Sequence, residues 1–131
     1  MRHRLLGVVL AAAAVLGTAS VLSAHHSVAG QFDLSKQVTL KGTVSKVDWV
    51  NPHIYLHLDV KGDDGKVVTW ALGTVPTAMA RRAGLTRESI GGHSGEVVTI
   101  EANPARDGTQ HLGWVNTITY ADGKKHELSG R

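Results

Sequence analysis

The chain has 131 residues, of which 42% are hydrophobic and 19% are charged, a composition typical of one modest globular domain and not of a disordered or fibrous chain. It contains no cysteine, which excludes a disulfide scaffold, a thiolate metal site, a cysteine nucleophile and a lipid anchor on cysteine. The formal net charge is +3, and the cations are scattered instead of forming a basic stripe, so nucleic acid is not an expected partner.

The first 24 residues have the pattern of a secretory signal peptide. Residues 1–4 are basic, residues 5–16 form an apolar run, and small residues follow up to Ala24. The apolar run approaches the length that spans a bilayer, so an uncleaved membrane anchor is the alternative interpretation. Cleavage after Ala24 fits the small-residue pattern best. We therefore expect a periplasmic or secreted protein, with no stable membrane insertion after cleavage.

Alternation of apolar and polar residues predicts a β domain over residues 38–128, after an extended segment over residues 25–37. The apolar positions of the first strand change phase after Gly42, which predicts a bend or bulge there. Turn signals at residues 63–65 and 122–123 are typical of β-hairpins. Five strands are expected, at residues 38–49, 53–60, 66–72, 96–102 and 112–120.

A short helix is expected between the third and fourth strands. Pro76 favours a helix start, residues 77–83 favour its body, Gly84 favours its end, and Thr86 is placed to cap a further turn. Three strands, a helix and two strands form the element order of an OB barrel. We therefore predict a mainly β protein, a small five-stranded OB-like barrel with one short helix between strands 3 and 4. A small open β-sandwich, or a sheet with one covering helix, fits the same pattern.

Several short motifs resemble those of one known family. They are Ala-His-His-Ser at residues 24–27, VTLKGTV at residues 38–44, Trp-Val-Asn-Pro-His at residues 49–53 and the turn at residues 122–125. Over residues 24–128 the chain resembles a family of small exported bacterial proteins known as a domain of unknown function. The resemblance implies export and a small β domain, without an activity. The family pattern leads us to expect an aromatic residue after His-His-Ser, and this chain has Val28 there instead.

The histidines at the expected mature start suggest a metal site. If cleavage leaves His25 first, its α-amine and ring nitrogen can chelate one ion, and a second imidazole would complete a T-shaped nitrogen site suited to Cu(II). If cleavage falls one residue earlier, His26 stands third, and a square-planar Cu(II) or Ni(II) site forms with the amine and two backbone nitrogens. Met79 is the one methionine after the signal segment, so nitrogen ligands for Cu(II), Ni(II) or Zn(II) are expected.

The second imidazole is expected from His53. The stiff Asn-Pro pair before it fixes its position, and Trp49 is close enough in sequence to form a wall of the site. His57 lies on the same strand face, four residues on at about 13 Å, too far for both rings to bind one ion directly. His57 and His111 are therefore secondary candidates, and we expect His57 to pair with Asp59 or Tyr55.

Each of these residues also has an ordinary interpretation. The histidines at positions 25 and 26 fit a solvated terminus, and residues 51–53 fit a loop that turns the chain between strands. His93 and His126 are expected to be exposed. Trp70 and Trp114 are expected to be core or half-buried sheet residues.

Two functions therefore stay open. The first is an exported small binding protein that takes Cu(II) through its mature N-terminal histidine and His53. The second is a metal-free OB-type module that binds a protein, a peptide or an envelope ligand. The chain has no motif of a serine hydrolase, a zinc protease or a nucleotide-binding loop, so we do not predict an enzyme. Copper-dependent oxidative chemistry is the third alternative.

Overall fold

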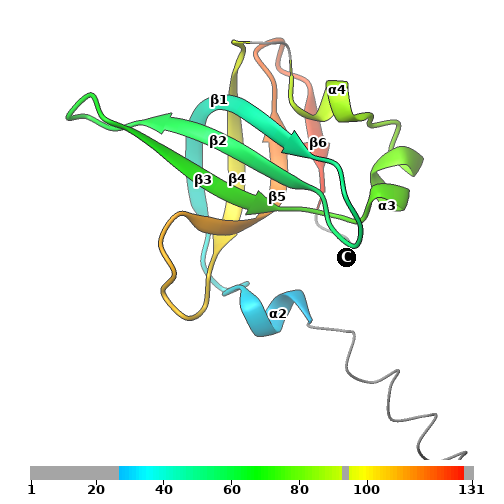
Figure 1. Cartoon of the computed structure of the whole chain (residues 1–131), viewed down its shortest axis with the longest axis horizontal. Helices are drawn as coiled ribbons and strands as arrows, with labels where there is room; N and C mark the ends of the chain where they lie inside the picture. Colours follow the sequence, from blue (N-terminus) through cyan, green and yellow to red (C-terminus); the bar gives the residue numbers. More distant parts are fainter. Residues whose placement is uncertain (1–26, 93–94, 129–131) are drawn as a thin grey trace, which may run out of the picture.

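The computed structural model describes residues 27–92 and 95–128 (Figure 1). The expected signal segment, His25, His26 and His93 lie outside the described residues. The elements in chain order are α2 (Val28–Gln31), β1 (Val38–Asp48), β2 (Tyr55–Lys61), β3 (Val67–Gly73), α3 (Thr77–Arg82), α4 (Arg87–Ile90), β4 (Val97–Pro104), β5 (Leu112–Thr119) and β6 (Lys125–Glu127).

The strands form a closed barrel. The order in the sheet is β3-β2-β1-β4-β5-β6, with antiparallel neighbours throughout. A parallel pairing of β3 with β5, from Ala71 opposite Leu112 to Gly73 opposite Trp114, closes strands 1 to 5 into a ring. The predicted five-stranded OB-like barrel is thereby confirmed. The structure adds β6 on the outer edge of β5, and it has two short helices between strands 3 and 4 where one was expected.

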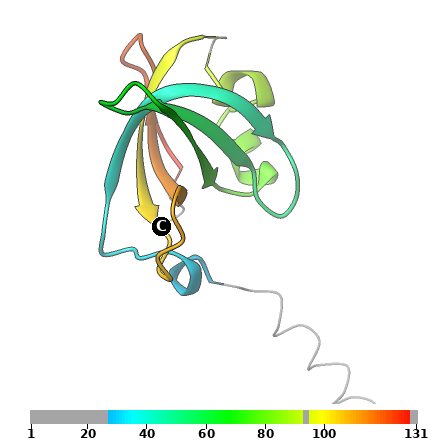
Figure 2. The same cartoon turned by 60° about the vertical axis from the view of Figure 1, so that its left-hand side comes forward.

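The bend of β1 lets one strand serve two neighbours (Figure 2). Its first half pairs with β4 up to Thr43, and its second half pairs with β2 from Thr43 onward. The register with β2 shifts between Val44 and Lys46, which confirms the predicted bulge. Gly42 is buried at this bend, and a Cβ there would overlap the carbonyl group of Asp59. The absence of a side chain is therefore what allows β1 and β2 to approach each other.

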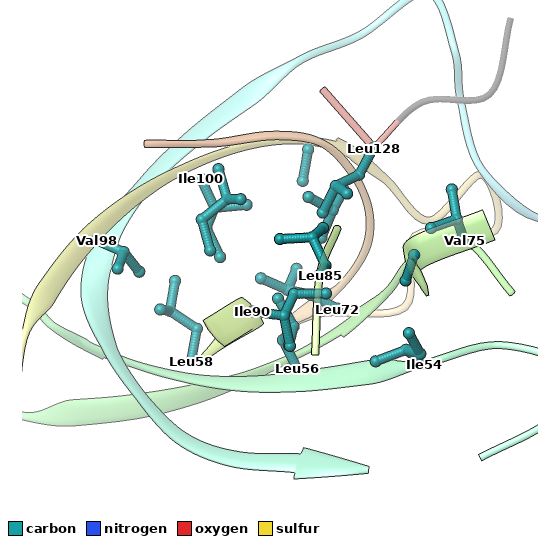
Figure 3. Packing of buried hydrophobic residues seen from close by; sticks show 14 of the residues in the cluster. Ile54, Leu56, Leu58, Leu72, Val75, Leu85, Ile90, Val98, Ile100 and Leu128 are labelled. Atoms are coloured by element: carbon teal, nitrogen blue, oxygen red, sulfur yellow. The ribbon is translucent and has the colours of Figure 1, made fainter. Parts of the chain in front are cut away.

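The core fills the barrel interior, and residues of the helical segment, among them Leu85 and Ile90, pack into it (Figure 3). In β2, Leu56 and Leu58 are completely buried, whereas the residues between and around them face outward, as the alternation predicts. Ile90 of α4 is also completely buried, and Thr86 caps that helix by accepting a hydrogen bond from the Ser89 N–H at 3.1 Å, as expected. The other core residues include Leu40, Leu72, Ala80, Val98, Ile100, Val115 and Ile118.

Tyr120 connects the end of β5 to α4 and gives a pH-dependent prediction. Its hydroxyl donates a hydrogen bond to the Ile90 carbonyl oxygen at 3.2 Å, and burial, helped by the charges of Glu96 and Asp122, raises the pKa of Tyr120 to about 12. Because this pKa lies above the ordinary value of 10.0, the stabilisation from the neutral phenol is complete below that pH and is lost as the pH rises towards 12. Phenolate absorbance, titrated in the wild type and in Tyr120→Phe, should give a difference curve with its midpoint near 12. A midpoint at the ordinary tyrosine value would contradict the burial.

Candidate functional site

His53 is held at the mouth of the barrel, in the loop between β1 and β2. Next to it, the Ile54 carbonyl accepts a hydrogen bond from the Thr74 N–H at 2.8 Å, which fixes the loop against the end of β3. Nδ1 of His53 lies 3.2 Å from the Thr74 carbonyl oxygen. A carbonyl can only accept, so Nδ1 is the donor, and the tautomer with this proton has its lone pair on Nε2. Within the described part of the chain, Nε2 has no hydrogen-bond partner.

Trp114 forms the wall against which His53 rests. The His53 ring meets the Trp114 ring edge-on, with centroids 5.2 Å apart and planes at 84°. Phe32 packs against the same indole at 5.7 Å. Gly73 makes room for the indole, because a Cβ there would lie 3.2 Å from the Trp114 ring. Trp114 is therefore a buried sheet residue, as expected, and it also holds the imidazole in place.

The wall expected from Trp49 is not seen. Trp49 is partly buried and packs against the hydrophobic core. No sequence spacing indicated Trp114 for this role, because β5 reaches His53 only through the parallel pairing that closes the barrel. The prediction that depended on nearness in the sequence was wrong, and the contact depends on the fold.

The segment before β1 is anchored to the loop between β4 and β5. Phe32 is 1% exposed and forms an isolated bridge with Ala105. Arg106 donates from Nε to the Ala29 carbonyl at 3.0 Å and from its backbone N–H to the Gln31 carbonyl at 2.9 Å. Figures 1 and 2 both place α2 beside this loop. Within the segment expected to be extended, residues 28–31 thus form one helical turn fixed to the barrel.

A broad depression of about 1020 Å³ connects this segment with His53. Val28, His53 and Trp114 all line it, so the first described residues and the imidazole face the same space. Its rim includes two exposed apolar side chains, Leu34 at 51% and Met79 at 41%. Charged residues line it as well: Lys36, Glu101, Lys125 and Glu127.

His57 belongs to a separate surface cluster. Its Nε2 lies 2.8 Å from Oδ2 of Asp48, whose other oxygen is 2.8 Å from Nζ of Lys46. The hydrogen bonds from Lys46 and, second, from His57 lower the pKa of the Asp48 carboxyl. The expected pairing of His57 with Asp59 or Tyr55 is wrong: Asp59 accepts a hydrogen bond from the Thr69 hydroxyl at 2.6 Å instead. The bulge in β1 is the reason, because it brings Asp48 to the outer face beside β2.

The remaining described histidines are also separate from His53. His111 has a left-handed backbone with φ of 56° and meets Trp70 edge-on at 5.4 Å. His126 is partly buried and lies edge-on against Tyr120 at 5.8 Å, although exposure was expected. These two rings and His57 are not among the side chains that line the depression at His53.

The described ranges, 27–92 and 95–128, contain no group of three or more His, Asp or Glu side chains placed to hold a metal ion. Across those same residues, no helix has both the length and the apolar character needed to cross a bilayer.

The fold and the site define the class of protein: a small OB-like barrel. In it, His53 packs against the buried Trp114, and the N-terminal segment is fixed beside the depression that His53 lines. The chain belongs to a family of unknown function, DUF6152, whose model matches residues 12–114. This match confirms the resemblance to a domain of unknown function. Comparison with curated proteins and with solved structures gives no match.

Proposed function

We propose that this chain is an exported small β-barrel protein that binds Cu(II) through its mature N-terminal histidine and His53. The observation that carries the proposal is the contact of His53 Nδ1 with the Thr74 carbonyl at 3.2 Å. Metal-binding histidines usually donate their second ring N–H to a carbonyl or carboxylate, which fixes the ring and directs the other nitrogen at the ion. His53 has this arrangement, and Trp114 limits the rotation of its ring.

The anchored N-terminal segment supports the same proposal. Val28 lines the depression that His53 lines, and Arg106 and Phe32 hold the segment there. Chain geometry allows at most about 3.6 Å per residue, so His25 can lie no more than about 11 Å from Val28 along the chain. The α-amine and ring of His25, together with Nε2 of His53, would supply three nitrogen ligands for Cu(II).

The alternative geometry needs no ligand from the barrel. If the mature chain begins at Ala24, the amine, two backbone nitrogens and the imidazole of His26 would fill a square plane around Cu(II) or Ni(II). Intact mass of protein exported by a bacterial host identifies the first residue. Competitive Cu(II) titration followed by electron paramagnetic resonance then distinguishes the two geometries. A weak and heterogeneous signal with no one-to-one stoichiometry would overturn the proposal.

Metal binding should also stabilise the fold. A ligand that binds only the native state, at a free concentration of 100 times its Kd, adds about 2.7 kcal/mol to the free energy of unfolding. We expect a clear rise in the thermal midpoint of the processed protein with Cu(II), and a smaller rise with Mg(II), whose preferred ligands are oxygens. Differential scanning calorimetry measures both. An unchanged midpoint with Cu(II) would contradict a native metal site.

A metal-free binding module is the second candidate function. The exposed side chains of Leu34 and Met79 place apolar surface on the rim of the depression, beside Lys36 and Glu127. Such a mixed surface fits a peptide, a protein or an envelope ligand with both apolar and charged groups. This candidate predicts that the thermal midpoint does not respond to metal, so the same calorimetric experiment separates the two functions.

A further inference from the structure

Met79 has an exposed side chain, which contributes little to the packing of the core. In α3, Ala80 is completely buried against the core, whereas Met79 beside it is 41% exposed. Its side chain lines the same depression as His53. Met79 and His53 therefore line one depression, and among the described residues Nε2 of His53 has no hydrogen-bond partner.

The segments that carry Met79 and His53 are bonded to each other. The Thr77 hydroxyl, at the start of α3, donates to Oδ1 of Asn51 at 2.8 Å, and Asn51 belongs to the loop that holds His53. The Met79 N–H donates to the Pro76 carbonyl at 2.9 Å, which fixes the first turn of the helix. The first hydrogen bond ties the start of α3 to the loop of His53, and the second fixes the backbone of Met79 within the helix. The three rotatable bonds of methionine then let the sulfur adapt its position.

The chemistry of this pair selects a particular ion. A thioether is a soft ligand that favours Cu(I), and an imidazole nitrogen binds copper readily. Carboxylates, which suit hard ions, line the same depression at Glu101 and Glu127. Glu101 already accepts a hydrogen bond from Thr117 at 2.6 Å and lies 3.6 Å from Lys125. We infer that Nε2 of His53 and the sulfur of Met79 form a binding site for Cu(I). The inference rests on the proposed function only in that both use His53.

The site gives this protein a way to hold copper in both oxidation states. The amine and imidazoles proposed for Cu(II) are nitrogen ligands, and Met79 adds the soft ligand that the reduced ion prefers. His53 would then be common to the two states, while Met79 would matter for Cu(I) alone. This division of roles is what the experiment tests.

The test compares Met79→Leu with the wild type as processed full-length protein. Cu(I), supplied without oxygen, is titrated in competition with the chromophoric chelator bicinchoninate, and Cu(II) affinity is measured separately. We expect Met79→Leu to weaken Cu(I) binding by about 10-fold to 100-fold and to leave Cu(II) binding unchanged. The factor is the one found when a residue that hydrogen-bonds to a metal ligand is removed, and loss of a direct ligand should cost at least as much. Leu34→Ala is the matched control, because Leu34 is another exposed apolar residue of the same depression and has no sulfur.

X-ray absorption of the Cu(I) protein adds a direct readout. A sulfur shell in the wild type that is lost in Met79→Leu would support the inference, whereas nitrogen ligands alone in the wild type would overturn it. Equal Cu(I) affinity of Met79→Leu and wild type would also overturn it and leave the Cu(II) proposal intact. Methionine-dependent Cu(I) binding without Cu(II) binding would support this inference while the proposed function fails.

Discussion

His25→Ala and His53→Ala are each expected to weaken Cu(II) binding by about 10-fold to 100-fold or more, because each removes a direct ligand. Loss of a residue that only hydrogen-bonds to a ligand already weakens metal binding by that factor. The ring of His53 is fixed by the Thr74 carbonyl and by Trp114, so no other described imidazole can take its place. His126→Ala is the matched control. Its ring lies against Tyr120 and outside the depression, and its removal should leave the affinity unchanged.

The pattern of losses identifies the geometry. With a T-shaped site, His53→Ala and His25→Ala both weaken binding, and the double variant should be little weaker than the worse single variant, because the remaining site has already lost its chelate. With a square-planar terminus, His26→Ala removes the affinity and His53→Ala has no effect. Equal small losses for His25, His53 and His126 would show that the histidines bind copper only as surface groups.

Gly42→Ala is expected to destabilise the barrel by about 3 kcal/mol or more, at or beyond the upper end of ordinary overpacking. The added Cβ would overlap the carbonyl of Asp59, which is backbone in the ladder between β1 and β2 and has no free direction in which to move. Urea unfolding followed by circular dichroism should show a lower midpoint with an unchanged slope.

The control for this substitution is Gly62→Ala in the turn after β2. A Cβ there would meet Oδ1 of Asp64 at 3.0 Å, the end of an exposed side chain. Rotation of that side chain gives up one exposed hydrogen bond from the Lys66 N–H and moves no backbone, so the loss of stability should be smaller than for Gly42→Ala. The same midpoint for Gly42→Ala and Gly62→Ala would contradict the role of Gly42 in the bend.

The parts of the fold that depend on local pattern could be predicted from the sequence. The alternation at residues 54–58 gives the buried face of β2, the phase change near Gly42 gives the bulge, and Thr86 gives the cap of α4. Those signals act within one element or one turn. The short strand β6 escaped prediction because its three residues are too few to show a period.

The contacts of the candidate site depend on register and closure, which no local pattern contains. Alternation put His57 on the outer face, but the bulge in β1 decided that Asp48 is its partner. Sequence nearness suggested Trp49 beside His53, whereas Trp114, some sixty positions later, lies there because β3 and β5 meet. The sequence did indicate His53 as a positioned imidazole, and its binding of metal stays a prediction.

The closure of the barrel has a consequence for the order in which the chain folds. β3 and β5 meet through three residue pairs only, and these pairs join segments far apart in the sequence, so the barrel is expected to close late in folding and to open first. The Ala71 amide, which donates to the His111 carbonyl at 2.8 Å, belongs to this joint, and Trp114 is its last pair. A ligand bound at His53 against Trp114 would stabilise the pairing of β3 with β5. Its presence would be visible as slower hydrogen exchange at Ala71, which is eighteen residues along the chain from His53, the described histidine that holds the ligand.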